Sequence, residues 1–297
     1  MKLERRRTIA NFALIGPAAI AIVIFMVIPL AMMAWISIQA RSYGGGVHWG
    51  ELTGEAWLRF LFERELDDSL SWSFNYLAII IRSVWLSLIT TVLSLLVGFP
   101  TAFFMATRAR KWRTLLVFMV TLPFWTNLLV RNYAWILILR DHGTINGLLL
   151  TLGIIDQPLP LLHNQFAVAV GLTYSFLPFM VLPIYASLEK VDLRLVEAAF
   201  DLYANRWQAL RKIIIPLAVP GIIAGCILVF IPSLGSYVTP ELLGGGKTLM
   251  IGNLIGHQFG AARNWPFGAA LGLFLLALVL IAMTLYALRG RRSAVPS

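Results

Sequence analysis

The stretch EAAFDLYANRWQALRKIIIPLAVPG, residues 197–221, carries the charge pattern that decides the fold. It begins acidic, turns basic, ends with two prolines and lies between two long apolar runs. The chain of 297 residues is 59% hydrophobic and only 13% charged, whereas soluble domains normally carry about 25% charged residues. This composition predicts an integral membrane protein, in which a charged segment of this length lies outside the bilayer.

Long runs without Asp, Glu, Lys or Arg predict the transmembrane helices. A helix needs about 20 apolar residues to cross a bilayer. Five runs exceed that length, and a sixth continues past Arg131 into NYAWILIL. We therefore predict an all-α membrane protein with six transmembrane helices, the first retained rather than cleaved as a signal peptide. The expected ranges are 11–38, 79–106, 114–138, 165–188, 215–238 and 266–288.

The basic residues predict which ends of these helices face the cytoplasm. With six spans both termini lie on one side, and the segments on that side hold 16 of the 24 Lys and Arg residues. These are Lys2, Arg5, Arg6, Arg7, Arg108, Arg110, Lys111, Arg113, Lys190, Arg194, Arg206, Arg211, Lys212, Arg289, Arg291 and Arg292. The positive-inside rule makes this side, with both termini and the quoted stretch, cytoplasmic. The net charge of +10 is therefore a topology signal and not a sign of nucleic-acid binding.

Residues 41–76 form the longest segment expected on the outer side. Its acidic residues are Glu51, Glu55, Glu63, Glu65, Asp67 and Asp68. Two interpretations stay open, a solvated acidic loop or a docking surface for a partner outside the cytoplasm. The whole chain, 1–297, is expected to be one transmembrane domain with its core in 77–288.

Residues 192–212 predict two short helices joined by a turn. Asp192 is a plausible N-cap of the first helix, and Asn205 of the second. Glu197 and Asp201 are four residues apart and stack on one side of the first helix. Two like charges there weaken an isolated helix slightly, a cost that is expected if the carboxylates face a basic partner. The predicted element projects into the cytoplasm and suits a membrane protein that receives a push from a soluble motor.

This segment carries a resemblance to a known family. Glu-Ala-Ala at 197–199, a turn three residues later and Ile213-x-Ile215-Pro216 resemble the EAA loop of permease subunits of ABC importers. The stretches that begin at Leu122, Leu177 and Pro240 look like the spermidine/putrescine branch, and with the loop they cover most of 77–288. The resemblance implies the type I ABC importer permease fold and a multi-pass position in the bacterial inner membrane.

In that family the loop forms a coupling helix that docks on the ATP-hydrolysing subunit. The residues that the resemblance assigns to coupling are Glu197, Ala198, Ala199, Asp201, Tyr203 and Ala204. The family usually has glycine where this chain has Tyr203, because glycine reaches positive φ at little cost. A tyrosine there must be strained or adopt a different turn.

The resemblance also implies the partners of the chain. They are a dimer of ATP-binding subunits that holds ATP and Mg, a second permease subunit in a heterodimer, an extracytoplasmic solute-binding protein and membrane lipid. No cofactor, metal or catalytic site is expected in this chain itself. GGGKT at 244–248 lacks the first glycine of a phosphate loop, because Glu241 stands there. The four histidines show no ligand spacing, and no Ser/His/Asp set lies in the spans.

A polyamine pathway needs carboxylates for the ammonium groups and aromatic faces for cation–π contact. Candidates on the outer halves of the third to sixth spans are Trp125, Tyr133, Trp135, Tyr174, Phe179, Phe230 and Tyr237, with Glu241 and Asp141 for charge. Packing or interfacial anchoring is the alternative for each aromatic residue. Arg131 lies within the third span and is expected to reach the interface or to pair with Asp141 or Glu241.

Other functions stay open beside the polyamine importer. A permease of the same class could carry another solute, such as an opine, an organic amine or an anion. A stand-alone secondary carrier is disfavoured, because proton-coupled carriers bury carboxylates at the span centres and this chain has none there. A membrane enzyme is disfavoured by the missing catalytic set.

Overall fold

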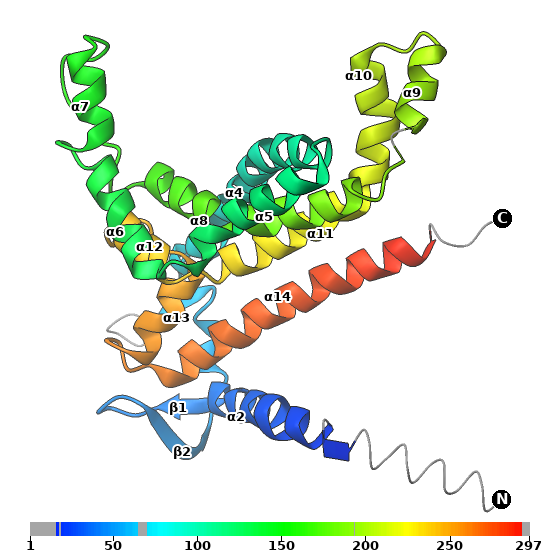
Figure 1. Ribbon diagram of the computed structural model, residues 1–297. Coiled ribbons are helices and arrows are strands. Elements are labelled where there is room, and N and C mark those ends of the chain that lie inside the picture. The colour runs from blue at the N-terminus through cyan, green and yellow to red at the C-terminus, as the bar shows by residue number, and fades with distance from the viewer. Residues whose placement is uncertain (1–15, 18, 65–69, 193, 293–297) are drawn as a thin grey trace, which may run out of the picture. The chain divides into compact units, whose positions relative to one another are not determined.

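A computed structural model of the chain describes residues 16–292 except 18, 65–69 and 193 (Figure 1). The first part of the expected helix 11–38 lies outside the described residues, as do Glu65, Asp67 and Asp68. The chain divides into two compact units. Unit 1 comprises Met1–Leu77 and Leu254–Ser297, and unit 2 comprises Ala78–Asn253.

Unit 1 combines long apolar helices with two β-hairpins. Its elements are η1 (Val23–Val27), α2 (Ile28–Ser37), β1 (Gln39–Arg41), β2 (Val47–Leu52), α3 (Glu55–Leu58), β3 (Phe62–Arg64), β4 (Leu70–Trp72) and α14 (Trp265–Arg292). Helix α14 packs along α2. The fully buried Phe267 at its start meets the rings of Phe60 and Tyr76 edge-on, which fixes this helix against the hairpin segment.

The segment expected as an acidic outer loop therefore has regular structure. Strand β1 pairs with β2 and β3 pairs with β4, both antiparallel. Glu51 lies 3.2 Å from Nδ1 of His48, and Glu55 forms an ion pair with Arg59 at 3.4 Å. Two acidic side chains of this segment are thus paired with basic residues of the same segment.

Unit 2 is a bundle of helices. It contains most of α4 (Asn75–Ala106), then α5 (Arg110–Trp125), α6 (Leu128–Leu139), α7 (Thr144–Thr151), α8 (Gln165–Leu188), α9 (Arg194–Asp201), α10 (Arg206–Ala209), η2 (Leu210–Ile214), α11 (Ile215–Leu234) and α12 (Val238–Gly244). Helix α13 (Ile251–Phe259) begins here and continues into unit 1.

The closest packing in unit 2 joins α8 to α11. A Cβ atom at Gly221 would meet the carbonyl oxygen of Pro183, and one at Gly225 would meet Met180. Small residues at such positions let two helix backbones approach each other, as the Gly-xxx-Gly spacing predicts. Helices α8 and α11 therefore form one closely packed pair.

Two apolar clusters form the core of unit 2. The first gathers the ends of α4 and α8 with η2 and α11, and includes Ala102, Met105, Met180, Val181, Ile184, Ile214 and Ala218. The second lies further back along α4 and at the start of α8, and includes Leu86, Leu139, Ala167, Val168, Leu172, Leu243 and Met250. The first cluster supports the segment around α9, and the second supports α6 and α12.

The described residues contain five helices that are long and apolar enough to cross a membrane. They are Ala19–Ser37, Asn75–Ala106, Gln165–Leu188, Arg206–Leu234 and Trp265–Thr284. A sixth span is obtained if the bent pair Arg110–Trp125 and Leu128–Thr151 counts as one. The expected set of six is thus present with one span broken.

The break corrects the expected single helix 114–138. The two halves meet at an angle of 90°. The Thr126 hydroxyl donates to the Pro123 carbonyl at 2.7 Å, and the Asn127 side chain accepts from the Leu129 amide at 2.8 Å. Asn127 is therefore the N-cap of a new helix, α6, and not a residue inside a continuous one.

Candidate functional site

The segment from α9 to α10 is held together by two side-chain caps. Oδ1 of Asp192 accepts from the Arg194 amide at 3.0 Å at the start of α9. At the start of α10, Asn205 and Gln208 form a reciprocal capping box with distances of 2.8 and 2.9 Å. Both predicted caps are confirmed. Figure 1 shows the two helices standing beyond the ends of α8 and α11 in unit 2.

The turn between these helices keeps the left-handed geometry that glycine normally provides. Tyr203 has a φ of 58°. Its amide donates to the Phe200 carbonyl at 2.9 Å, and the Ala204 amide donates to the Ala199 carbonyl at 3.0 Å. This pair of bonds is a Schellman motif with Tyr203 at the position that glycine usually takes. The left-handed conformation costs a non-glycine residue about 1–2 kcal/mol.

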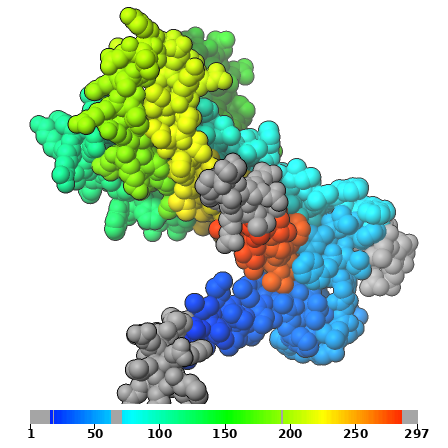
Figure 2. All heavy atoms as spheres, turned by 90° about the vertical axis from the view of Figure 1, so that its right-hand side faces the viewer, coloured from blue at the N-terminus to red at the C-terminus, as the bar shows by residue number. Residues whose placement is uncertain are grey.

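The outer side of this segment is charged and apolar at once. We call it the α9 surface and define it by the exposed side chains of Leu195, Glu197, Ala198, Phe200, Asp201, Leu202, Tyr203 and Trp207; the side chains of Arg194 and Arg206 are exposed beside it. Tyr203 and Leu202 are 98% and 81% exposed. Neither Glu197 nor Asp201 has an ion-pair partner in the part of the chain that the structure describes. Figure 2 shows the yellow-green segment at the surface of unit 2.

The other expected coupling residues lie just behind this surface. Ala199 and Ala204 are half-buried, and their backbone groups hold the turn through the bond between them. Glu197 and Asp201 have no ion-pair partner in the described chain and lie among exposed apolar side chains. This surface suits a groove on a partner protein that has basic side chains at its edge and apolar side chains at its base.

Five residues of α6, α8, α13 and the start of α12 make two sets of contacts, and we call these residues the pathway group. Its members are Trp135, Tyr174, Tyr237, Glu241 and Asn253. The rings of Trp135 and Tyr174 meet edge-on, with centroids 5.6 Å apart. Nδ2 of Asn253 donates to Oε2 of Glu241 at 2.8 Å and to the Tyr237 carbonyl at 2.9 Å. Because α12 packs against both α6 and α8, these two sets of contacts lie on neighbouring elements.

The remaining aromatic candidates take no part in these contacts. Trp125, at the end of α5, is 82% exposed, and Tyr133 on α6 is 56% exposed. Phe179 meets Phe124 edge-on at 5.3 Å and packs against the first apolar cluster. Phe230 is half-buried on α11. These four residues thus take packing or surface positions in this structure.

Arg131 lacks the pairing that was expected for it. Its Nε and Nη1 are buried and have no hydrogen-bond partner among the described residues. Asp141 is exposed at the end of α6, and neither it nor Glu241 forms an ion pair with Arg131. A guanidinium without an acceptor is costly within a membrane span, and reaching the membrane interface stays the other interpretation of Arg131. The half-helix start at Leu128 adds the positive end of a helix dipole on the same element.

Asn253 was missed by the sequence reasoning. It is fully buried and joins Glu241 to Tyr237. The available signal was a lone amide side chain in the apolar stretch MIGNLIG, where a buried polar group needs partners. Its partners lie 12 and 16 residues earlier, and nothing in the local pattern identifies them.

Comparison with known proteins gives three kinds of similarity. The family described as "Binding-protein-dependent transport system inner membrane component" matches residues 98–295. The chain is 44% identical over 211 residues to the spermidine/putrescine transport system permease protein PotB of Haemophilus influenzae. The aligned residues cover 71% of this chain and 74% of that protein. The PotB of Escherichia coli is equally similar, at 44% identity over 71% of this chain and 77% of that protein.

A more distant relative and a solved structure extend this result. The inner membrane ABC transporter permease protein YdcU of Escherichia coli is 35% identical over 70% of this chain and 69% of its own length. A chain of a bacterial ABC transporter that imports the acidic polysaccharide alginate superposes with a TM-score of 0.72 at 18% identity. That superposition covers 99% of this chain and 100% of the other, and it shows a shared fold.

Proposed function

Because the chain belongs to the family of binding-protein-dependent transport system inner membrane components, we propose that it is the permease subunit of an ABC importer for polyamines such as spermidine and putrescine. The chain is a multi-pass protein of the bacterial inner membrane with the fold of ABC importer permeases. The substrate class comes from the PotB relatives. Transport is driven by ATP hydrolysis in separate subunits, which hold the ATP and Mg.

The observation that carries the proposal is the exposed α9 surface on a bundle of membrane helices. Glu197 and Asp201 lack partners within the described chain, and exposed apolar side chains flank them. A surface of this kind loses unfavourable exposure and gains ion pairs when a basic, apolar groove covers it. We assign this surface to docking on the ATP-hydrolysing subunit, with Ala198, Ala199, Tyr203 and Ala204 as its backbone.

This docking sets the orientation of the chain. The α9 surface and both termini face the cytoplasm, where ATP is available. The positive charge of the segments on that side agrees with this orientation. The pathway group then lies toward the outer face, where a solute-binding protein delivers the solute.

Force applied to α9 has a direct route into the membrane helices. The helix Arg206–Leu234 runs without a break from the docking segment through the bilayer, and α11 packs along α8. ATP binding closes the two ATP-hydrolysing subunits, and this closure displaces α9 together with α8 and α11. The pathway opens by alternating access between two packed arrangements.

The pathway group suits a flexible organic cation. Glu241 supplies a carboxylate that Asn253 orients, and Trp135 and Tyr174 supply aromatic faces. An ammonium over an aromatic face gains about 0.5–2 kcal/mol, depending on how far it is desolvated. A second, related permease subunit completes the pathway in a heterodimer.

One observation favours a different solute for the same kind of permease. The buried guanidinium nitrogens of Arg131 have no acceptor in the described chain, and a positive charge opposes a cationic solute. A solute that carries a carboxylate beside its ammonium, such as an opine, offers an acceptor to Nε and Nη1 of Arg131. Arg131 therefore keeps an amino-carboxylate as the second candidate.

Reconstitution of the whole transporter tests the proposal. The chain is purified in mild detergent with its associated subunits and placed in liposomes with the cognate solute-binding protein. We expect an ATPase pair and a second permease to co-purify, and ATP-dependent uptake of spermidine that putrescine inhibits. Uptake of an amino-carboxylate alone identifies the second candidate, and transport by the single chain under an ion gradient contradicts the importer.

A further inference from the structure

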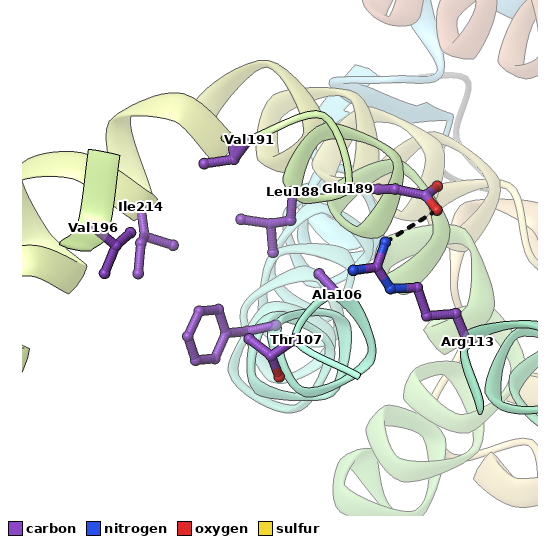
Figure 3. A pocket seen from close by; sticks show the side chains of 9 residues that line it. Ala106, Thr107, Arg113, Leu188, Glu189, Val191, Val196 and Ile214 are labelled. Carbon is purple, nitrogen blue, oxygen red and sulfur yellow. Dashed lines mark hydrogen bonds and ion pairs between the residues drawn. The ribbon is translucent and has the colours of Figure 1, made fainter. Parts of the chain in front are cut away.

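The end of unit 2 that carries α9 contains a cavity of about 70 Å³ (Figure 3). Four helices, the π-helical segment η2 and the loop after α8 meet around it. Its lining residues are Phe103, Ala106, Thr107, Arg113, Leu188, Glu189, Val191, Val196 and Ile214. Protein interiors are packed to near crystal density. A partly open pocket at the junction of so many elements leaves them less closely packed, so it is a place where they can shift relative to one another.

Helix α9 is attached to the bundle at this cavity. No described side chain of α9 is fully buried. Val196 points into the cavity and packs against the first apolar cluster. Figure 3 shows Val196 beside Ile214, with Leu188 and Ala106 across the space. A displacement of α9 is therefore felt first at Val196.

An ion pair lies at the rim of the same cavity. Nη1 of Arg113, at the start of α5, is 3.5 Å from Oε1 of Glu189, at the end of α8. Nε of Arg113 donates to the Arg108 carbonyl at 2.7 Å, just beyond α4. One side chain thus ties the ends of three long helices together. The two side chains are 25% and 47% exposed, and such pairs contribute only about 0–1 kcal/mol to stability.

Chain connectivity divides these helices into two sets. Helices α8 and α11 are joined to α9 through short connections, so they follow it directly. Helices α4 and α5 have no short connection to α9, because α6, α7 and α8 lie between them in the chain. They can follow only through their packing on α8 and, at this end, through the cavity walls and the Arg113–Glu189 pair.

We propose that Arg113, Glu189 and Val196 form the joint that makes α4 and α5 follow the movement of α9. The Arg113–Glu189 pair keeps the start of α5 aligned with the end of α8. The cavity gives Val196 room to move before it presses on α4. These are positioning residues, and this inference rests on the proposed function, in which α9 receives the push.

The test measures uptake and ATP hydrolysis together in the reconstituted transporter. Arg113→Gln and Glu189→Gln each remove the pair, and Ala106→Leu fills the cavity. We expect each to lower the amount of solute imported per ATP about fivefold, the lower end of typical coupling effects, while ATP hydrolysis continues. The exchange Arg113→Glu with Glu189→Arg is expected to restore the ratio. Arg110→Gln is the matched control, because Arg110 is exposed on the same helix and has no ion pair among the described residues.

The outcomes separate this inference from the proposed function. If all three single variants import as much solute per ATP as the unaltered transporter, the proposed joint of Arg113, Glu189 and Val196 is contradicted. A parallel fall of hydrolysis and uptake also contradicts it, because that result indicates a merely structural role. If Arg113→Glu with Glu189→Arg imports as little solute per ATP as the single variants, the ion pair has no role in coupling. Failure of the unaltered transporter to hydrolyse ATP or import solute contradicts the proposed function instead.

Discussion

The α9 surface and the pathway group are built in opposite ways within unit 2. The α9 surface is made by one continuous segment whose caps, Asp192 and Asn205, lie within a few residues of the amides they bind. The pathway group depends on Asn253, whose partners come from a different helix and the residue before it. A surface that docks on a partner must keep its shape by itself. In the proposed function the pathway group opens and closes, which suits contacts between elements that can separate.

Reversing the charge of the α9 surface should have the largest effect. Glu197→Lys with Asp201→Lys replaces two carboxylates with two cations facing a basic partner. We expect uptake to fall by at least about thirtyfold, because breaking a docked charge pair costs roughly 2 kcal/mol or more. Co-purification of the ATPase subunit and uptake by whole cells measure the effect.

Asp141→Lys with Asp156→Lys is the control for this prediction. Both residues are exposed and lie away from α9 in the sequence, and the change in net charge is the same. The control should retain the ATPase subunit. Normal co-purification and uptake of the Glu197/Asp201 variant would show that α9 is not the docking element.

Glu241→Gln should weaken solute binding at the pathway group. The amide keeps an acceptor for Asn253 but removes the charge that meets an ammonium. Hydrogen bonds to charged groups contribute about 1.5–3 kcal/mol, so the apparent KM for spermidine should rise about tenfold. The ATPase subunit should still co-purify. An unchanged KM would exclude Glu241 from the solute pathway. The comparison of a docking surface at α9 with a solute site at the pathway group would then fail.

Asn205→Ala should loosen the docking segment without touching the pathway. Loss of an N-cap costs about 1 kcal/mol, which corresponds to about fivefold faster local opening at α10. Hydrogen exchange of the amides of 206–209 measures this. Asn205→Ser keeps a capping oxygen and is the matched control. Equal exchange in the Ala and Ser variants would mean that the capping box does not hold the segment.

Tyr203→Gly should have the smallest effect. Glycine takes the left-handed conformation with little strain but loses more entropy on folding, so the two terms largely cancel. Exchange of the Ala204 amide should change less than about threefold, and uptake should persist. Tyr203→Val should exchange faster, because a β-branched residue is strongly disfavoured at positive φ. Equal exchange in both variants would contradict the left-handed turn.

The sequence predicted the local features well and the long-range ones poorly. The apolar runs predicted most helices, and Asp192 and Asn205 were recognised as caps because a cap depends on neighbouring residues. The bend between α5 and α6 was missed although Asn127 carried the signal, because the apolar run continues across it. The capping preference of asparagine outweighed the hydrophobic pattern.

Features that depend on residues far apart in the chain could not be predicted. The strand pairing in 39–72 requires knowledge of register, which the charged residues of this segment obscure. The contacts of Asn253 with Glu241 and Tyr237, and the Arg113–Glu189 pair across 76 residues, exist only once the helices pack. The rings of Trp135 and Tyr174 contact each other, whereas Trp125 and Tyr133 are exposed. The sequence alone does not distinguish these two pairs of aromatic candidates.

Site-specific cross-linking at α9 tests the central claim most directly. Cys226 is the sole cysteine of the chain, so Ala198→Cys in a Cys226→Ser background gives one reactive thiol on the α9 surface. In the assembled transporter this thiol should cross-link to the ATP-hydrolysing subunit and resist a membrane-impermeant reagent added to intact cells. A thiol that reacts with that reagent from outside, and does not cross-link to the ATPase subunit, would contradict the account.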